Sequence, residues 1–220
     1  MLPAYSLYLV VNRKNIPKGT IRAFIPALII IIFLLSPWLI FLPKQLNVGL
    51  SAAAASPAWA EVVGAPQIKN LALTFVKFTI GRISHDNNTT YALLFAPVGV
   101  FVAFLLSFAT LRISKERSFL WYWLFLITAL AFAISYFVPV FAYFRLLFLL
   151  PAFYLIASSA INSINWPPLN RTLLGLFLAI NLAASTIYFI YPKFQREHWK
   201  EATSYILQNS TPQTVTLFES

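Results

Sequence analysis

The sequence predicts an all-α polytopic membrane protein with five full transmembrane helices and a partial one at its N-terminus. Of the 220 residues, 60% are hydrophobic and only 10% are charged, whereas a soluble domain carries about 25% charged residues. The apolar residues form uninterrupted runs of about 20, the length that a helix needs to cross a bilayer core of about 30 Å. The five runs are 23–42, 91–111, 119–138, 141–161 and 172–191.

An apolar stretch of about ten residues, Leu2 to Val11, precedes these runs. It has no basic residue before it, so it lacks the charged start of a signal peptide, and it is too short to span a bilayer. We expect it to be the second half of a span that begins upstream of Met1. A short anchor lying in the membrane interface is the alternative.

The third and fourth runs are separated by very little polar sequence. Residues 119–161 contain one charged side chain, that of Arg145. As a single helix they would be about 65 Å long, roughly twice the thickness of the hydrocarbon core. We therefore expect two spans joined by a tight turn near Pro139, which extends to Phe144.

Basic side chains fill the connectors before the first run, between the second and third runs, and before the fifth. The positive-inside rule places these connectors on the cytoplasmic side. The loop 43–90, the turn near Pro139 and the tail from Pro192 then share the exoplasmic side. The basic residues concerned are Arg13, Lys14, Lys18, Arg22, Arg112, Lys115, Arg117 and Arg171.

The exoplasmic loop contains one segment with helical periodicity, Gln67 to Arg82. Its apolar residues recur at helical spacing, which suits a helix lying in the membrane interface. The alternative is that this apolar face packs against the bundle. These apolar residues are Ile68, Leu71, Phe75 and Phe78.

Two further segments lie outside the spans. Ser51 to Ala60 is rich in Ala and Ser and predicts a mobile loop. In the tail, Gln195 to Gln208 has helical spacing, and Thr214 to Phe218 has strand propensity after a break at Pro212. We therefore divide the chain into a transmembrane domain, 1–191, and the truncated beginning of an exoplasmic α/β domain, 192–220.

Composition also limits the function classes. The formal charge of +10 is carried beside apolar spans and not on one presentable face, which argues against a nucleic-acid partner and for membrane lipid. There is no Cys, and the two histidines, His85 and His198, are far apart in sequence. We expect no metal site and no cofactor.

Three short stretches carry a resemblance that covers most of the chain. Together they look like the C-terminal half of membrane glycosyltransferases of the GT-C superfamily, in the branch of the protein O-mannosyltransferase-like and aminoarabinose-transferase-like enzymes. The first resembles a proline-tryptophan helix end followed by a glutamine-bearing external segment, the second an arginine-led helix with a proline, and the third a helix that opens the external domain. The stretches are Ser36-Pro37-Trp38 with Pro43-Lys44-Gln45-Leu46, Phe144-Arg145-Leu146 through Pro151 to Ser158, and His198-Trp199-Lys200-Glu201-Ala202 with Tyr205-Ile206.

The resemblance implies transfer of a sugar from a polyprenyl-phosphate carrier to an acceptor on the exoplasmic face of a prokaryotic plasma (inner) membrane. In this superfamily the catalytic carboxylate lies in the first external loop, to which nothing in this chain corresponds. On the predicted exoplasmic side, the acidic residues outside the tail are Glu61 and Asp86, and neither matches a catalytic position of the family. The catalytic residue is therefore unknown, and we expect the chain to be inactive without a missing N-terminal part of the enzyme.

Candidate residues for the carrier phosphate lie near the exoplasmic ends of the spans. Arg145 is the foremost, because an ionisable side chain within a span is a functional hypothesis by default and guanidinium pairs bidentately with phosphate. Its alternative is an arginine that snorkels into the head groups. The other candidates are Tyr143, Lys44, Lys77 and Arg82, for which the alternatives are contacts with anionic lipid and an interfacial tyrosine belt.

A second function class remains open on the sequence alone. The chain could be a small polytopic transporter or a non-catalytic membrane scaffold, in which the apolar helices pack or line a path. Transporters usually contain internal repeats with interrupted helices at the bilayer midplane, and no repeat is evident among these spans.

Overall fold

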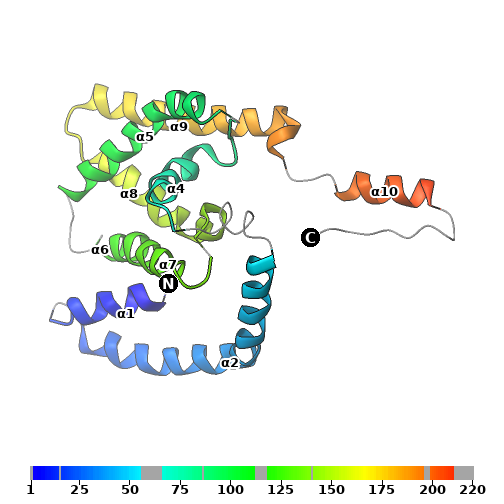
Figure 1. Ribbon diagram of the computed structural model, residues 1–220. Coiled ribbons are helices and arrows are strands. Elements are labelled where there is room, and N and C mark those ends of the chain that lie inside the picture. The colour runs from blue at the N-terminus through cyan, green and yellow to red at the C-terminus, as the bar shows by residue number, and fades with distance from the viewer. Residues whose placement is uncertain are drawn as a thin grey trace.

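The computed structural model describes residues 2–14, 16–55, 66–85, 87–111, 118–139, 141–195 and 199–210, and these are helices and their connections, with no strand among them (Figure 1). The predicted all-α class is therefore confirmed for this part of the chain. The longer helices are α1 (Leu2–Val11), α2 (Lys18–Ala55), α4 (Ile68–Ile80), α5 (Asn88–Thr110), α8 (Leu150–Asn162), α9 (Pro167–Ile190) and α10 (Trp199–Asn209). The shorter ones are α6 (Ser118–Trp121), a π-helical turn (Tyr122–Leu126), α7 (Ile127–Ile134), and the 3₁₀ helices η3 (Tyr143–Leu149) and η4 (Pro192–Phe194).

Four of these helical stretches are long and apolar enough to cross a membrane, which supports the membrane assignment. They are Arg22–Ser51, Thr89–Thr110, Tyr143–Asn162 and Pro167–Ile190. The run 119–138 instead forms the apolar helix Ser118–Ile134, which is shorter than these four. Such a helix is about 25 Å long, less than the hydrocarbon core, so the count of five full spans stays a prediction.

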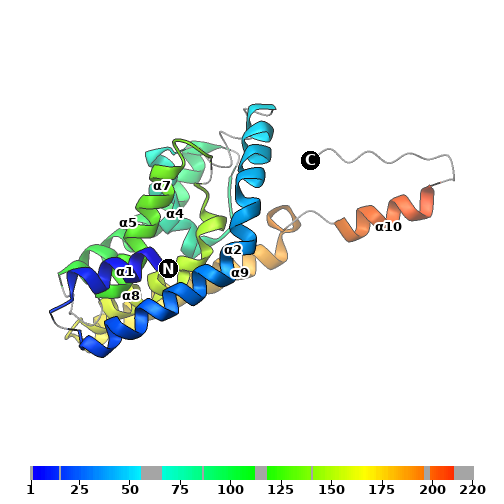
Figure 2. The same ribbon diagram turned by 90° about the horizontal axis from the view of Figure 1, so that it is seen from below.

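Helix α2 differs from the prediction at its C-terminal end. The exoplasmic loop was expected to begin at Pro43, but Pro43 lies inside the helix, as do Pro26 and Pro37. In lipid the backbone has no water to bond with, so a helix continues past a proline that would end it in water. The helix bends sharply (Figures 1 and 2), as proline-containing helices do. Within the loop predicted at 51–60, residues 51–55 are helical and 56–60 lie outside the described residues.

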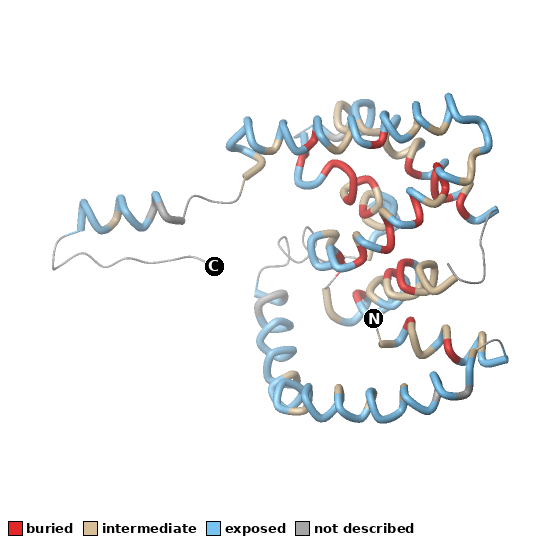
Figure 3. The backbone as a smooth tube through the Cα atoms, turned by 180° about the vertical axis from the view of Figure 1, so that it is seen from behind, coloured by how far each residue is buried: buried red, intermediate tan, exposed pale blue. Residues whose placement is uncertain are grey.

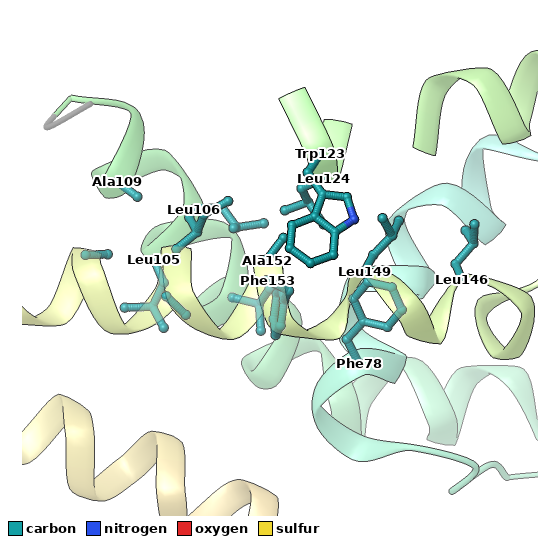
Figure 4. Packing of buried hydrophobic residues seen from close by; sticks show 14 of the residues in the cluster. Phe78, Leu105, Leu106, Ala109, Trp123, Leu124, Leu146, Leu149, Ala152 and Phe153 are labelled. Atoms are coloured by element: carbon teal, nitrogen blue, oxygen red, sulfur yellow. The ribbon is translucent and has the colours of Figure 1, made fainter. Parts of the chain in front are cut away.

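Helices α5, α8 and α9 form the centre of the bundle with α4. Helix α9 is antiparallel to α5, because Phe101 faces Phe177 at a ring-centroid distance of 6.4 Å while Ala184, further along α9, packs near Tyr91 at the start of α5. Large apolar side chains fill the space between α4, α5, α8 and the π-helical turn (Figure 4). Among them Leu105, Leu149 and Phe153 are almost completely buried.

The predicted reversal near Pro139 is present. Helix α7 ends at Ile134, Ala142 is extended, and the chain returns through η3 into α8, which packs against α6. Helix α1 lies on α6 and the π-helical turn, where Tyr5 and Tyr8 contact the ring of Phe119. The statement that α1 is the second half of a longer span stays a prediction.

Helix α4 packs into the bundle. Of the two predictions for this segment, the structure therefore favours an apolar face that packs against other helices over a helix lying in the membrane interface. The second half of α4 is buried against α5, α9 and η3, including Thr74, Phe78 and Ile80, while Ile68 at its start is exposed. The apolar periodicity was therefore correct, but the surface it meets is protein. The helix ends at Gly81, whose φ of 65° and ψ of −138° suit glycine alone.

The tail agrees with the prediction over its helix only. Helix α10 covers Trp199–Asn209, where 195–208 was expected, and it stands apart from the bundle with an exposed surface (Figures 1 and 3). Residues 196–198 and 211–220, which include the predicted strand 214–218, lie outside the described residues.

Replacement of Gly81 should destabilise the fold. A methyl group at Gly81 meets no atom within 4 Å, so the cost comes from the backbone conformation and is about 1–3 kcal/mol. We expect Gly81→Ala to unfold at a lower temperature in detergent. Gly175→Ala, inside α9 and also in open space, is the control and should unfold at the wild-type temperature or slightly above it, because alanine is favoured over glycine inside a helix. Equal unfolding temperatures for the two variants would contradict this account.

The antiparallel packing of α5 and α9 predicts which connections share a side of the membrane. The chain has no Cys, so single-cysteine variants can be labelled without background. We expect Ser84→Cys and Lys193→Cys to react with an impermeant maleimide from one side, and Asn165→Cys only from the other. Labelling of Ser84→Cys and Lys193→Cys from opposite sides would exclude this arrangement.

Candidate functional site

Four helix ends meet at one end of the bundle and bring basic and aromatic side chains together. The C-terminal turn of α4 supplies Lys77 and is followed by Arg82, while Tyr91 comes from the start of α5, Tyr143 from η3, and Tyr188 from the end of α9. We call these five residues the basic-aromatic cluster. Arg82 and Tyr188 line one cavity, and both lie within electrostatic reach of the Tyr143 hydroxyl.

Lys77 lies at the centre of this cluster and is partly buried. Its Nζ donates a hydrogen bond to the carbonyl oxygen of Ile83 at 2.5 Å. The same nitrogen is 5.3 Å from the ring centroid of Tyr91 and 5.6 Å from that of Tyr143, within the range of cation-π attraction. The turn at Gly81 makes this possible, because it folds the chain back over the last turn of α4.

The surroundings of Lys77 disfavour its charged form. Burial, and secondarily the nearby charge of Arg82, lower the pKa of Lys77 from 10.5 to about 8. Among the described residues no carboxylate is recorded in an ion pair with it. The site therefore holds two cationic side chains whose natural complement is an anion.

A cavity of about 190 Å³ opens between α4 and the segment that leads into η3. Lys77 and Tyr143 bring an ammonium group and a phenol to its wall, and the hydroxyl of Thr74 is already bonded to the carbonyl oxygen of Asn70 at 2.8 Å. Its lining residues are Asn70, Leu73, Thr74, Lys77, Phe141, Ala142, Tyr143 and Phe144.

A second cavity, of about 320 Å³, lies beside α4 at its contacts with α8 and α9. Arg82 is its charged residue, and the others are polar, aromatic, or small and aliphatic. They are Phe78, Thr79, Ile80, Gly81, Tyr154, Asn181, Ala184, Ser185, Tyr188 and Phe189. The two cavities thus lie along the same helix, with Lys77 on one and Arg82 on the other.

Of the five candidate residues, the structure brings three together: Lys77, Arg82 and Tyr143. Lys44 lies on the exposed surface of α2, which makes few contacts with the bundle. The side chain of Arg145 is also exposed, and its Nη1 donates to the carbonyl oxygen of Pro139 at 2.9 Å. Arg145 lines neither cavity.

Sequence reasoning missed two members of the cluster, Tyr91 and Tyr188. Both lie at predicted exoplasmic ends of spans, where an interfacial tyrosine belt is the ordinary interpretation. Only tertiary contacts distinguish Tyr91 from an ordinary interfacial tyrosine. Its ring faces Lys77, and its hydroxyl is buried without a hydrogen-bond partner.

Comparison with protein-family models, with curated proteins and with solved structures returned no match for this chain. Among the described residues, no group of three or more His, Asp or Glu lies close enough together to hold a metal ion.

The lowered pKa of Lys77 makes the stability of the fold depend on pH. Below pH 8 the folded state holds a charge that burial disfavours, and that penalty disappears between about pH 8 and 10.5 because the folded amine loses its proton first. We expect the unfolding temperature of the wild type to rise between pH 7 and 9.5 relative to Lys77→Met.

Lys69→Met is the matched control, since Lys69 is exposed on the same helix. It should retain the pH profile of the wild type. The other titratable groups that face Lys77 are Arg82, Tyr91 and Tyr143, and they are present in both variants. A profile for Lys77→Met that is the same as the wild type would refute the assignment.

Proposed function

We propose that this chain is the membrane part of a glycosyltransferase that uses a polyprenyl-phosphate sugar donor, and that the basic-aromatic cluster binds the phosphate of the donor. One observation carries the proposal: two cations and three tyrosines from separate segments converge at one end of a bundle of apolar helices. A lipid phosphate is an anion that arrives at such a place with an apolar chain attached.

The chemistry of the cluster suits a phosphate. The guanidinium of Arg82 can bind two phosphate oxygens in a fork, and the ammonium of Lys77 acts as a point charge. Partial burial of Lys77 strengthens its attraction for an anion, because less water screens the charge. Tyrosine hydroxyls supply further donors, and the hydroxyl of Tyr91 is without a partner.

The same cations would assist the transfer. When the acceptor oxygen attacks the anomeric carbon, the bond from that carbon to the phosphate oxygen breaks, and the polyprenyl phosphate leaves with one more negative charge. Lys77 and Arg82 would stabilise that charge as it develops. The acceptor loses its proton to a base, and we assign that role to no residue of this chain, since neither Glu61 nor Asp86 lies within the described residues.

The proposal includes the orientation and cell location inferred from the sequence. The cluster would face the exoplasmic side of a prokaryotic plasma membrane, with loop 43–90 and the tail from Pro192 on the same side. Support comes from Lys77, Arg82, Tyr143 and Tyr188, which belong to connectors or span ends predicted to be exoplasmic and lie close together. We propose that another part of the same enzyme supplies the catalytic carboxylate.

A transporter is the weaker interpretation. Transport sites usually lie near the midplane of the bilayer, between interrupted helices. In the three bundle stretches Thr89–Thr110, Tyr143–Asn162 and Pro167–Ile190, the charged residues are Arg145 and Arg171, and each is close to the start of its helix. The charged groups thus lie toward the membrane surfaces, which suits head-group binding better than a path through the middle.

Binding of polyprenyl phosphate to the full chain in lipid nanodiscs tests the proposal. Charge-assisted hydrogen bonds contribute about 1.5–3 kcal/mol, so we expect Lys77→Gln and Arg82→Gln each to weaken binding about tenfold or more. Lys44→Gln on the exposed face of α2 should remain within about twofold of the wild type, since a surface charge near a bilayer contributes little. Native mass spectrometry or binding of radiolabelled lipid measures the difference.

Arg145→Gln tests whether the phosphate binds at the basic-aromatic cluster or at Arg145. If the phosphate lies in the basic-aromatic cluster, its effect should be smaller than that of Lys77→Gln, because Arg145 lines neither cavity. A larger loss for Arg145→Gln would move the phosphate to that residue. Equal retention of lipid by all four variants would refute phosphate binding by this chain.

A further inference from the structure

The cavity beside α4, α8 and α9 has polar groups that the packing of the fold does not use. Thr79 lines it and is 4% exposed, yet its Oγ1 has no hydrogen-bond partner. Leaving a buried hydroxyl unpaired costs about 1–3 kcal/mol. Buried polar groups are nearly always paired, so this one calls for a function.

The same cavity is lined by a hydrogen-bonded pair of side chains. The hydroxyl of Tyr154 donates to Oδ1 of Asn181 at 2.5 Å, with the carbonyl oxygen of Phe78 at 3.1 Å as a second acceptor. Nδ2 of Asn181 donates to the carbonyl oxygen of Phe177 at 2.8 Å, which leaves its second hydrogen unassigned. These bonds hold the amide in place and tie α8 and α9 to α4.

Further along α9, the hydroxyl of Ser185 and the ring of Tyr188 line the same cavity, and Arg82 approaches it from the end of α4. No acidic side chain is among the described lining residues. Hydroxyl, amide and aromatic groups with a guanidinium at one end are complementary to a ligand that carries several hydroxyls and one anionic group.

We infer that this cavity holds the sugar ring of a hexosyl phosphate, with its hydroxyls toward Thr79, Asn181 and Ser185 and its phosphate at Arg82. The inference rests on the proposed function and deepens it, since Arg82 belongs both to this cavity and to the basic-aromatic cluster. The volume of about 320 Å³ is in the range of small-molecule sites. The sugar and the phosphate would therefore occupy adjoining parts of one site at the end of α4.

Two variants test the sugar contacts without removing a recorded hydrogen bond. Thr79→Val replaces an unpaired hydroxyl by a methyl group of similar shape, so the fold should be as stable as the wild type or more stable. Ser185→Ala changes an exposed residue. The matched controls are Thr128→Val, a buried threonine on α7, and Thr186→Val, the exposed neighbour of Ser185; neither lines the cavity.

The measurement compares three ligands on the full chain in nanodiscs: polyprenyl phosphate, polyprenyl-phosphate hexose and free hexose 1-phosphate. We expect the hexose to raise the affinity of the lipid at least fivefold. Thr79→Val with Ser185→Ala should remove that increment while leaving the affinity for bare polyprenyl phosphate unchanged. The two control variants should retain the increment.

The ligands distinguish failure of this inference from failure of the proposed function. Binding of bare polyprenyl phosphate with no gain from the hexose overturns the sugar site and leaves the phosphate site intact. Binding of free hexose 1-phosphate that the double variant weakens, without binding of the lipid, supports the cavity and refutes the lipid donor. An increment that the double variant retains, or no binding of any of the three ligands, also overturns the inference.

Discussion

The hydrocarbon core of a bilayer offers no hydrogen-bond partner to a backbone N–H or C=O group, and the rest of this structure depends on that constraint. It explains why every described segment long enough to cross the membrane is a helix. It also explains α2, which continues through three prolines because the groups that proline leaves unpaired have no better partner in lipid. The irregular backbone near the spans, at Gly81 and between α7 and η3, is found at the ends of helices.

The same scarcity of polar partners determines the surroundings of the charged side chains at the helix ends. Where α4, α5, η3 and α9 end or begin, a lysine is left with one carbonyl oxygen and two aromatic rings as neighbours. Such an environment neither neutralises the charge with a described carboxylate nor hydrates it fully. Lys77 and Arg82 therefore lie near each other at this end of the bundle, and Arg82 is also on the wall of the cavity between α4, α8 and α9.

Three of the five residues of the basic-aromatic cluster could be inferred from the amino-acid sequence. Lys77, Arg82 and Tyr143 were candidates because they lie in segments that the distribution of basic residues places on a single side, and the fold does bring them together. Arg145 was preferred because it is the single charge between residues 119 and 161. The sequence could not show that the guanidinium of Arg145 donates a hydrogen bond to the carbonyl oxygen of Pro139, or that Arg145 lines neither cavity.

Amino-acid sequence by itself determined the helical class, the membrane environment and the approximate position of each long apolar helix, because these follow from local hydropathy summed over about 20 residues. It determined equally that Leu71, Phe75 and Phe78 share a face of α4. Only the tertiary structure decided that this face meets α5, α8 and η3, that Tyr91 lies on Lys77, and that Thr79 faces a cavity with Asn181. Those contacts join residues up to about a hundred positions apart, and periodicity carries no information about which apolar face a helix will meet.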